Sequence, residues 1–226
     1  MSVTYHEHVL PNGLRIAAEV DPHAASAAAG FFVRSGARDE PTDLMGISHF
    51  LEHMVFKGTA TRSGEEIDKA FDELGVNHNA WTSHEITAFH VHGLPSTLEP
   101  ALRILADIMQ PALRSADLAD EAEVVVEEIA MYEDQPFWQL WERVSEMYYG
   151  KHPMGHRVLG TAKSVRAVSP DEMRAWHAER YGANNVVLAL AGKVDFEQVC
   201  TLADSLCGHW ASTGATRTPH EMTHSE

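Results

Sequence analysis

Two histidines and a glutamate interrupt the otherwise apolar stretch GISHFLEHMVFKGT at residues 46–59. On a helix that turns about 100° per residue, His49 and His53 lie about 40° apart, one turn above the other. Glu52 lies about 60° to the other side of His49 and on the same face. Two imidazoles at this spacing can bind one metal ion, and the carboxylate between them can reach a water bound to that metal.

The apolar residues of this stretch gather opposite the polar ones. They are Ile47, Phe50, Leu51, Met54 and Val55. The order His-x-x-Glu-His is the inverse of the metalloprotease helix motif. The alternative is that all three polar residues have ordinary partners on an ordinary helix. A third ligand would decide the matter, because catalytic zinc usually takes three protein ligands and a water.

A candidate third ligand lies in SADLADEAEVVVEEIAMYEDQ (residues 115–135), a predicted long helix that ends before Pro136. One predicted face carries Glu121, Val124, Val125, Glu128 and Tyr132. The opposite face carries Glu123, Glu127, Ala130 and Asp134 and is expected to be solvated. Glu128 therefore faces inward, where a carboxylate needs a cation, and Glu121 could support the site from two turns earlier. The alternative is that all these acids form a charged surface, as most glutamate runs do.

Four segments together resemble the pitrilysin and mitochondrial-processing-peptidase family of zinc endopeptidases. They are GARDEP…GISHFLEHMVFKGT, NAWTSHEITAF, EAEVVVEEI and HPMGHRVLGT, and the resemblance extends to about residue 208. It implies one zinc ion per chain, with His49, His53 and Glu128 as ligands. It further implies that Glu52 is the general base and Glu121 an assisting glutamate.

The same resemblance makes HNAWTS an edge strand. Asn79 and Ala80 would then bind the substrate backbone by strand addition. The alternative is an ordinary strand with polar ends.

The remaining pattern predicts strands and helices in mixed order. Strands are expected on both sides of Asn12-Gly13, at 25–36, twice within 76–93, and at 184–192. Helices are expected at 44–57, 63–75, 95–110, 115–135, 137–149, 169–181 and 195–207. We therefore expect an α+β sandwich of one mostly antiparallel sheet packed with helices. The domain should span 1–208, and 209–226 reads as a linker-like or disordered tail.

The charge balance restricts the partners. The formal net charge is −16, which argues against nucleic acid or an anionic membrane as a partner. No apolar run is long enough to span a bilayer, and no signal peptide is visible. With only two cysteines, Cys200 and Cys207, we expect a cytoplasmic protein in a reducing compartment.

Family members usually have two similar halves, and this sequence resembles the half with the metal motif. We therefore expect peptide substrates and either a second homologous half, a partner subunit or a homo-oligomer. Two other functions remain open: a non-catalytic scaffold subunit of the same fold, and a metal-dependent lyase of the related quorum-signal synthase fold. The lyase would need a reactive cysteine.

Overall fold

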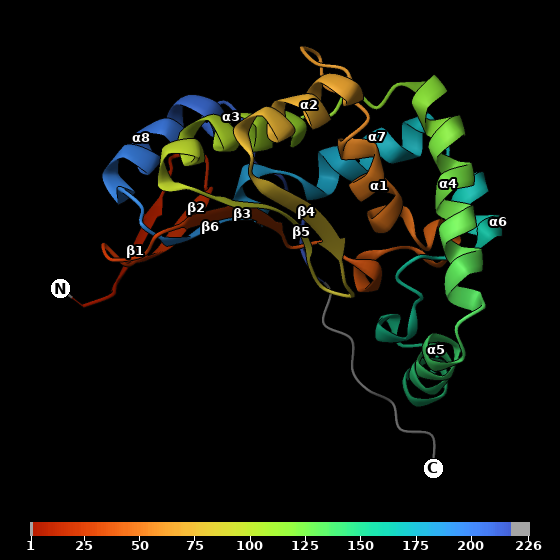
Figure 1. The fold of residues 1–226 in the computed structure, drawn as a ribbon. Helices are drawn as coiled ribbons and strands as arrows, with labels where there is room; N and C mark the ends of the chain where they lie inside the picture. Colours follow the sequence, from red (N-terminus) through yellow and green to blue (C-terminus); the bar gives the residue numbers. More distant parts are fainter. Residues whose placement is uncertain (1, 218–226) are drawn as a thin grey trace.

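The computed structural model describes residues 2–217, and its centre is one six-stranded sheet (Figure 1). Its strands are β1 (Thr4–Val9), β2 (Arg15–Val20), β3 (Ala27–Val33), β4 (Asn77–Thr82), β5 (Thr87–Gly93) and β6 (Val186–Gly192). They lie in the order β1-β2-β6-β3-β5-β4, and only the β2–β6 pair is parallel. The predicted α+β fold with a mostly antiparallel sheet is confirmed.

The first two strands form the expected hairpin around Asn12-Gly13. Val9 pairs with Arg15, and Gly13 turns the chain with a φ of 91°. The chain later returns through β6, which lies between β2 and β3 in the middle of the sheet. The last strand of the described sequence is therefore central to the sheet, whereas the first, β1, lies at its edge.

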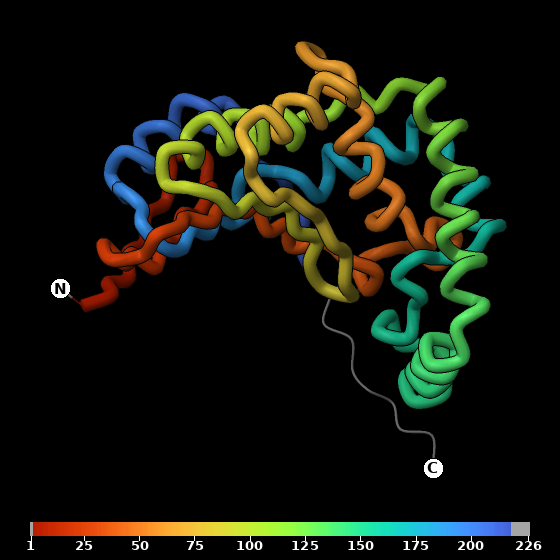
Figure 2. Tube along the Cα trace, in the orientation of Figure 1, coloured from red at the N-terminus to blue at the C-terminus, as the bar shows by residue number. Residues whose placement is uncertain are grey.

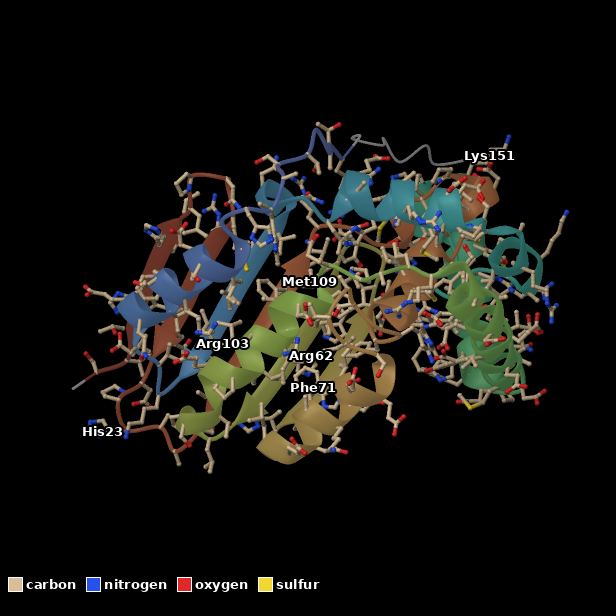
Figure 3. The ribbon with its side chains drawn as sticks, turned by 90° about the horizontal axis from the view of Figure 1, so that it is seen from above. His23, Arg62, Phe71, Arg103, Met109 and Lys151 are labelled. Atoms are coloured by element: carbon tan, nitrogen blue, oxygen red, sulfur yellow. The ribbon has the colours of Figure 1, made fainter. Side chains whose placement is uncertain are left out.

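Eight helices accompany the sheet in the described part of the chain. They are α1 (Ile47–Val55), α2 (Gly64–Leu74), α3 (Leu98–Ile108), α4 (Ser115–Glu133), α5 (Pro136–Tyr149), α6 (Ala162–Ala167), α7 (Pro170–Arg180) and α8 (Phe196–Cys207). Helices α2, α3 and α8 cover one face of the sheet, and the opposite face carries none of the described helices (Figure 1). Seen from above, α3, which carries Arg103, runs beside α8 over the sheet, in roughly the direction of the strands (Figure 3).

The core lies between this helical layer and the sheet. Its fully buried aromatic residues come from four elements: Phe31 of β3, Phe50 of α1, Phe71 of α2 and Phe89 of β5. Alternate residues of β6 are buried, as expected for a sheet covered on one face. Helices α4 and α5 lie beyond the β4 edge, away from α8 (Figure 2). None of these described helices is both long and apolar enough to cross a bilayer.

Two features differ from the expected elements. Helix α6 is not among the expected helices. Thr161 and Ser164 cap each other at its start, and six residues are too few to show a helical period. Residues 209–217 contain no helix or strand, yet they pack on the domain. Trp210 is buried with its ring 5.4 Å from that of Phe31, and Arg217 pairs with Asp39. The remainder of the expected tail, 218–226, lies outside the described residues.

Candidate metal centre

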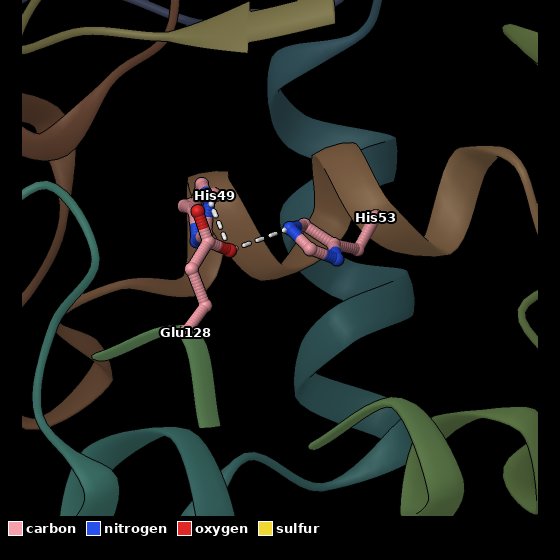
Figure 4. Close-up of side chains that lie close together, drawn as sticks. All are labelled: His49, His53 and Glu128. Carbon is pink, nitrogen blue, oxygen red and sulfur yellow. Dashed lines mark ion pairs between the residues drawn. The ribbon is translucent and has the colours of Figure 1, made fainter. Parts of the chain in front are cut away.

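Three candidate ligands from two helices meet at one point (Figure 4). Oε2 of Glu128 lies 3.5 Å from Nε2 of His49 and 3.2 Å from Nε2 of His53. One ligand atom from each residue lies within 4.8 Å of the other two. Among the described residues, this is the only group of three or more such side chains arranged to hold a metal ion.

Helix α1 presents its histidines because its apolar stripe fixes its rotation. Ile47, Phe50, Leu51, Met54 and Val55 are all buried. The two histidines consequently face α4, which packs against α1. His49 is buried and His53 is half-buried, so both rings need a partner.

Helix α4 presents Glu121 and Glu128 to α1, while Glu123 and Glu127 are exposed, as predicted. The prediction that Val124 lies on the inward face is wrong, because 48% of this residue is exposed. The buried strip of α4 follows Leu118, Ala122, Val125 and Ile129. Val124 lies about 100° from Val125 around the helix and falls outside that strip.

Glu121 contacts the side of His53 that faces away from Glu128. Nδ1 of His53 donates a hydrogen bond of 2.9 Å to Oε1 of Glu121. The other oxygen of Glu121 forms an ion pair with Lys57. The chain Lys57–Glu121–His53 fixes the orientation of the His53 ring, as carboxylates behind metal-binding histidines commonly do. Nδ1 of His49 is buried and has no such partner in the described structure.

The two histidines differ in their affinity for protons. Burial lowers the pKa of His49 to about 4. Burial also disfavours the charged form of His53, but its bonds to Glu121 and Glu128 outweigh this cost and raise its pKa to about 9. The hydrogen bond from His53 in turn lowers the pKa of Glu128. Without a metal, the proton shared by this cluster therefore resides on His53.

Glu52 lies on the same helix but outside the ligand cluster. Its Oε2 accepts a hydrogen bond of 2.5 Å from Oγ1 of Thr82, at the end of β4. Burial raises the pKa of Glu52, against the opposing effect of this hydrogen bond. Glu52 therefore lines the same pocket as His53 without being one of the three converging ligands.

Asn79 and Ala80 lie on β4, which pairs only with β5 and forms an edge of the sheet. Together with Glu52, His53 and Glu121 they line a pocket of about 310 Å³. Strand β4 therefore runs past the ligand cluster with one side unpaired. Sequence reasoning did not identify Lys57 or Thr82, because both act through contacts between elements distant in the chain.

The donor set fits zinc. Two imidazole nitrogens and a carboxylate oxygen are ligands typical of catalytic zinc. Bonds of about 2.0–2.1 Å at tetrahedral angles place ligand atoms about 3.4 Å apart. The 3.5 and 3.2 Å distances from Glu128 to the two histidines bracket that value.

Two sequence models of one family match the chain. The model described as "Insulinase (Peptidase family M16)" matches residues 15–162, more than half of the chain. The model described as "Peptidase M16 inactive domain" matches residues 167–225. The division between the two models does not divide the fold, since β6 belongs to the second match and lies between β2 and β3.

Curated relatives and solved structures agree with this match. An uncharacterized zinc protease of Mycobacterium leprae is 39% identical over 194 residues, covering 85% of this chain and 44% of the relative. One of Rickettsia felis is 34% identical over 207 residues, covering 91% of this chain and 50% of the relative. The chain thus spans about half the length of these relatives.

Among solved structures, a protease from Helicobacter pylori superposes with a TM-score of 0.90 at 23% identity, over 96% of this chain and 53% of that one. Pitrilysin gives 0.87 at 20% identity, over 98% of this chain and 24% of that one. At these identities the superpositions establish the fold alone. From the sequence match, the fold and the converging His-His-Glu cluster, we conclude that this chain belongs to the insulinase family, peptidase family M16.

Proposed function

We propose that this chain is the metal-carrying part of a zinc endopeptidase that hydrolyses peptides or unfolded segments. The observation that carries the proposal is the convergence of His49, His53 and Glu128, with Glu52 outside this group but lining the same pocket as His53. Membership of a peptidase family and the naming of relatives as zinc proteases support it.

The chemistry follows from the roles of these side chains. Zinc bound by His49, His53 and Glu128 would supply a Lewis acid that polarises the scissile carbonyl and lowers the pKa of water. Glu52 takes the proton of the attacking water and passes it to the leaving amine. Its raised pKa suits both steps. A carboxylate whose pKa is shifted toward neutral pH takes up a proton more readily than an ordinary glutamate and can still release it. No covalent enzyme intermediate is needed.

Glu121 is proposed to assist by holding His53, whose Nδ1 it contacts. The substrate backbone is proposed to add to the unpaired side of β4, near Asn79 and Ala80. The pocket that these two residues share with Glu52 and His53 supports this placement, because a strand bound there would pass the cluster.

Further substrate contacts are proposed to come from a second homologous half, either as a continuation of the polypeptide or as a separate subunit. The relatives are about twice as long as the matched part. Helix α5 supports this proposal, because none of its residues is buried. Its exposed apolar residues are Phe137, Trp138, Leu140, Trp141, Val144, Met147 and Tyr148.

The positions of the cysteines do not support the lyase alternative. Both cysteines lie in α8, which covers the sheet at the end away from α4 (Figure 1). Burial raises the pKa of Cys207 to about 12, which makes it a poor nucleophile. A scaffold subunit of the same fold would differ from the proposed enzyme only in lacking peptidase activity. An assay of peptide hydrolysis therefore separates the two.

The test is Glu52→Gln, with Glu127→Gln on the exposed face of α4 as the control. Both variants are assayed for zinc content and peptide hydrolysis in a form, alone or with the second half, in which the wild type is active. Glu52→Gln should keep its zinc and lose about 10²–10⁴-fold in rate, while Glu127→Gln should match the wild type. Undiminished hydrolysis by Glu52→Gln would refute the assignment of the base, and loss of zinc would make Glu52 a structural residue or a ligand.

A further inference from the structure

A second buried carboxylate lies at the start of α1. Glu40 is only 4% exposed. Its Oε2 accepts a hydrogen bond of 2.7 Å from the backbone N–H of Gly46, and its Oε1 accepts one of 2.8 Å from that of Ser48. None of the ion pairs found among the described residues involves Glu40. Its partners are backbone groups of the helix that carries His49 and His53.

Helix α1 needs these bonds because its own cap position offers none. The first N–H groups of a helix have no partner inside it, and a Ser, Thr, Asp or Asn side chain at the N-cap usually supplies one. The N-cap side chain does so in α2, α6, α7 and α8. The N-cap of α1 is Gly46, which has no side chain. Glu40 replaces the missing cap from six residues upstream.

A second contact holds the same turn from the other side. Gly46 has a φ of 93°, and a Cβ placed there would lie 2.6 Å from the carbonyl oxygen of Leu159. Oγ of Ser164 donates a hydrogen bond of 2.7 Å to the carbonyl oxygen of Met45. The start of α1 is thus enclosed between Glu40 and the segment around Leu159 and Ser164.

We propose that Glu40 is a positioning residue of the metal centre: by anchoring the first turn of α1, it fixes His49 relative to Glu128 of α4. His49 is the third residue of α1 and directly follows Ser48, whose N–H is bonded to Glu40. A side chain that only filled this buried space would be less costly if it were apolar. The inference rests on the proposed zinc site and adds a residue that touches neither metal nor substrate.

The chain offers a second capping glutamate as a control for this role. Like Glu40, Glu66 accepts a hydrogen bond from the backbone N–H of an N-cap residue, 2.8 Å from that of Ser63, although Glu66 is exposed and belongs to the helix that it caps. Helix α2 carries none of the candidate ligands. A loss of capping at Glu66 should therefore weaken its helix without moving the metal site.

The first experiment measures zinc affinity by competition with a chromophoric chelator, at a temperature where circular dichroism shows every protein folded. It compares wild type, Glu40→Gln, Glu40→Leu and Glu66→Gln. Both Glu40 variants should bind zinc about tenfold or more weakly, and Glu66→Gln should stay within about twofold. The visible absorption of the cobalt-substituted Glu40 variants should also change, which a loss of fold stability alone would not cause. Wild-type affinity and spectrum in both Glu40 variants, or an equal loss in Glu66→Gln, would overturn the proposal.

The second experiment needs no variant. Amide hydrogen exchange of the metal-free wild type should show Gly46 and Ser48 protected as strongly as the interior of α1. Exchange at the rate of free amides would overturn the proposal, whether or not the variants fold. Failure of the wild type to bind zinc would instead refute the metal centre itself, and this inference with it.

Discussion

Nδ1 of His53 lies 2.9 Å from Oε1 of Glu121, on the side of the ring away from Glu128. Glu121→Gln should therefore weaken zinc binding by about 10–100-fold, because the amide holds the ring less firmly and makes it a weaker ligand. The measurement is zinc affinity by chelator competition. The control is Glu123→Gln, an exposed residue of α4 that pairs with Arg166. Equal affinity in the two variants would mean that Glu121 does not support the site.

Lys57 should act on zinc only through Glu121, whose second oxygen it contacts. Lys57→Met should weaken zinc binding less than Glu121→Gln does. In the double variant, Lys57→Met should cause no further loss of zinc affinity beyond that of Glu121→Gln, because the Glu121 carboxylate that Lys57 contacts is already replaced. A double-mutant cycle of zinc affinities tests this expectation. Fully additive losses would show that Lys57 acts by another route.

Zinc binding should depend on pH through His53. Zinc takes a neutral imidazole, and the metal-free protein holds a proton on His53 up to a pKa of about 9. Zinc must displace that proton at lower pH, so affinity should fall about tenfold for each pH unit from 8 to 6.5. His49 adds no proton there, since burial lowers its pKa to about 4.

Calorimetry in two buffers of different ionisation enthalpy checks this prediction. At pH 7 about one proton should be released for each zinc bound. Affinity that stays constant over this pH range would contradict the assignment of the proton to His53.

The sequence was sufficient to identify residues that share one helix. Because α1 separates its apolar and polar residues cleanly, its rotation and the pairing of His49 with His53 follow from periodicity. The same reasoning separates the inward Glu128 from the exposed Glu127. It fails for Val124, because the buried strip of α4 is narrower than half of the helix.

Residues that act across the fold could not be predicted in this way. Thr82 reaches Glu52 from β4, Lys57 reaches Glu121 from the end of α1, and Glu40 caps α1 from a preceding loop. Each contact depends on how separate elements pack, which no periodicity encodes. The same holds for α5. The pattern of apolar residues at 137–149 predicts a helix, but it does not show that none of its residues is buried.

Tested alone, this chain should bind zinc but cleave unfolded peptides poorly or not at all. Positioning contributes much of an enzyme's rate, and a displacement of about 1 Å can cost a hundredfold. Activity on a quenched peptide library should appear when a second homologous half is supplied. The exposed apolar face of α5 should also favour self-association of the isolated chain, measurable as its mass in solution. Full activity from a strict monomer would contradict the need for a second half.

The most direct measurement of the metal centre is the zinc content of Glu128→Gln beside Glu127→Gln. These neighbours on α4 have the same side chain, but only Glu128 approaches His49 and His53. After dialysis against a weak chelator, the wild type and Glu127→Gln should each retain about one zinc per chain, while Glu128→Gln should lose most of it. Retention of zinc by Glu128→Gln together with its loss from Glu127→Gln would show that His49, His53 and Glu128 do not form the metal centre.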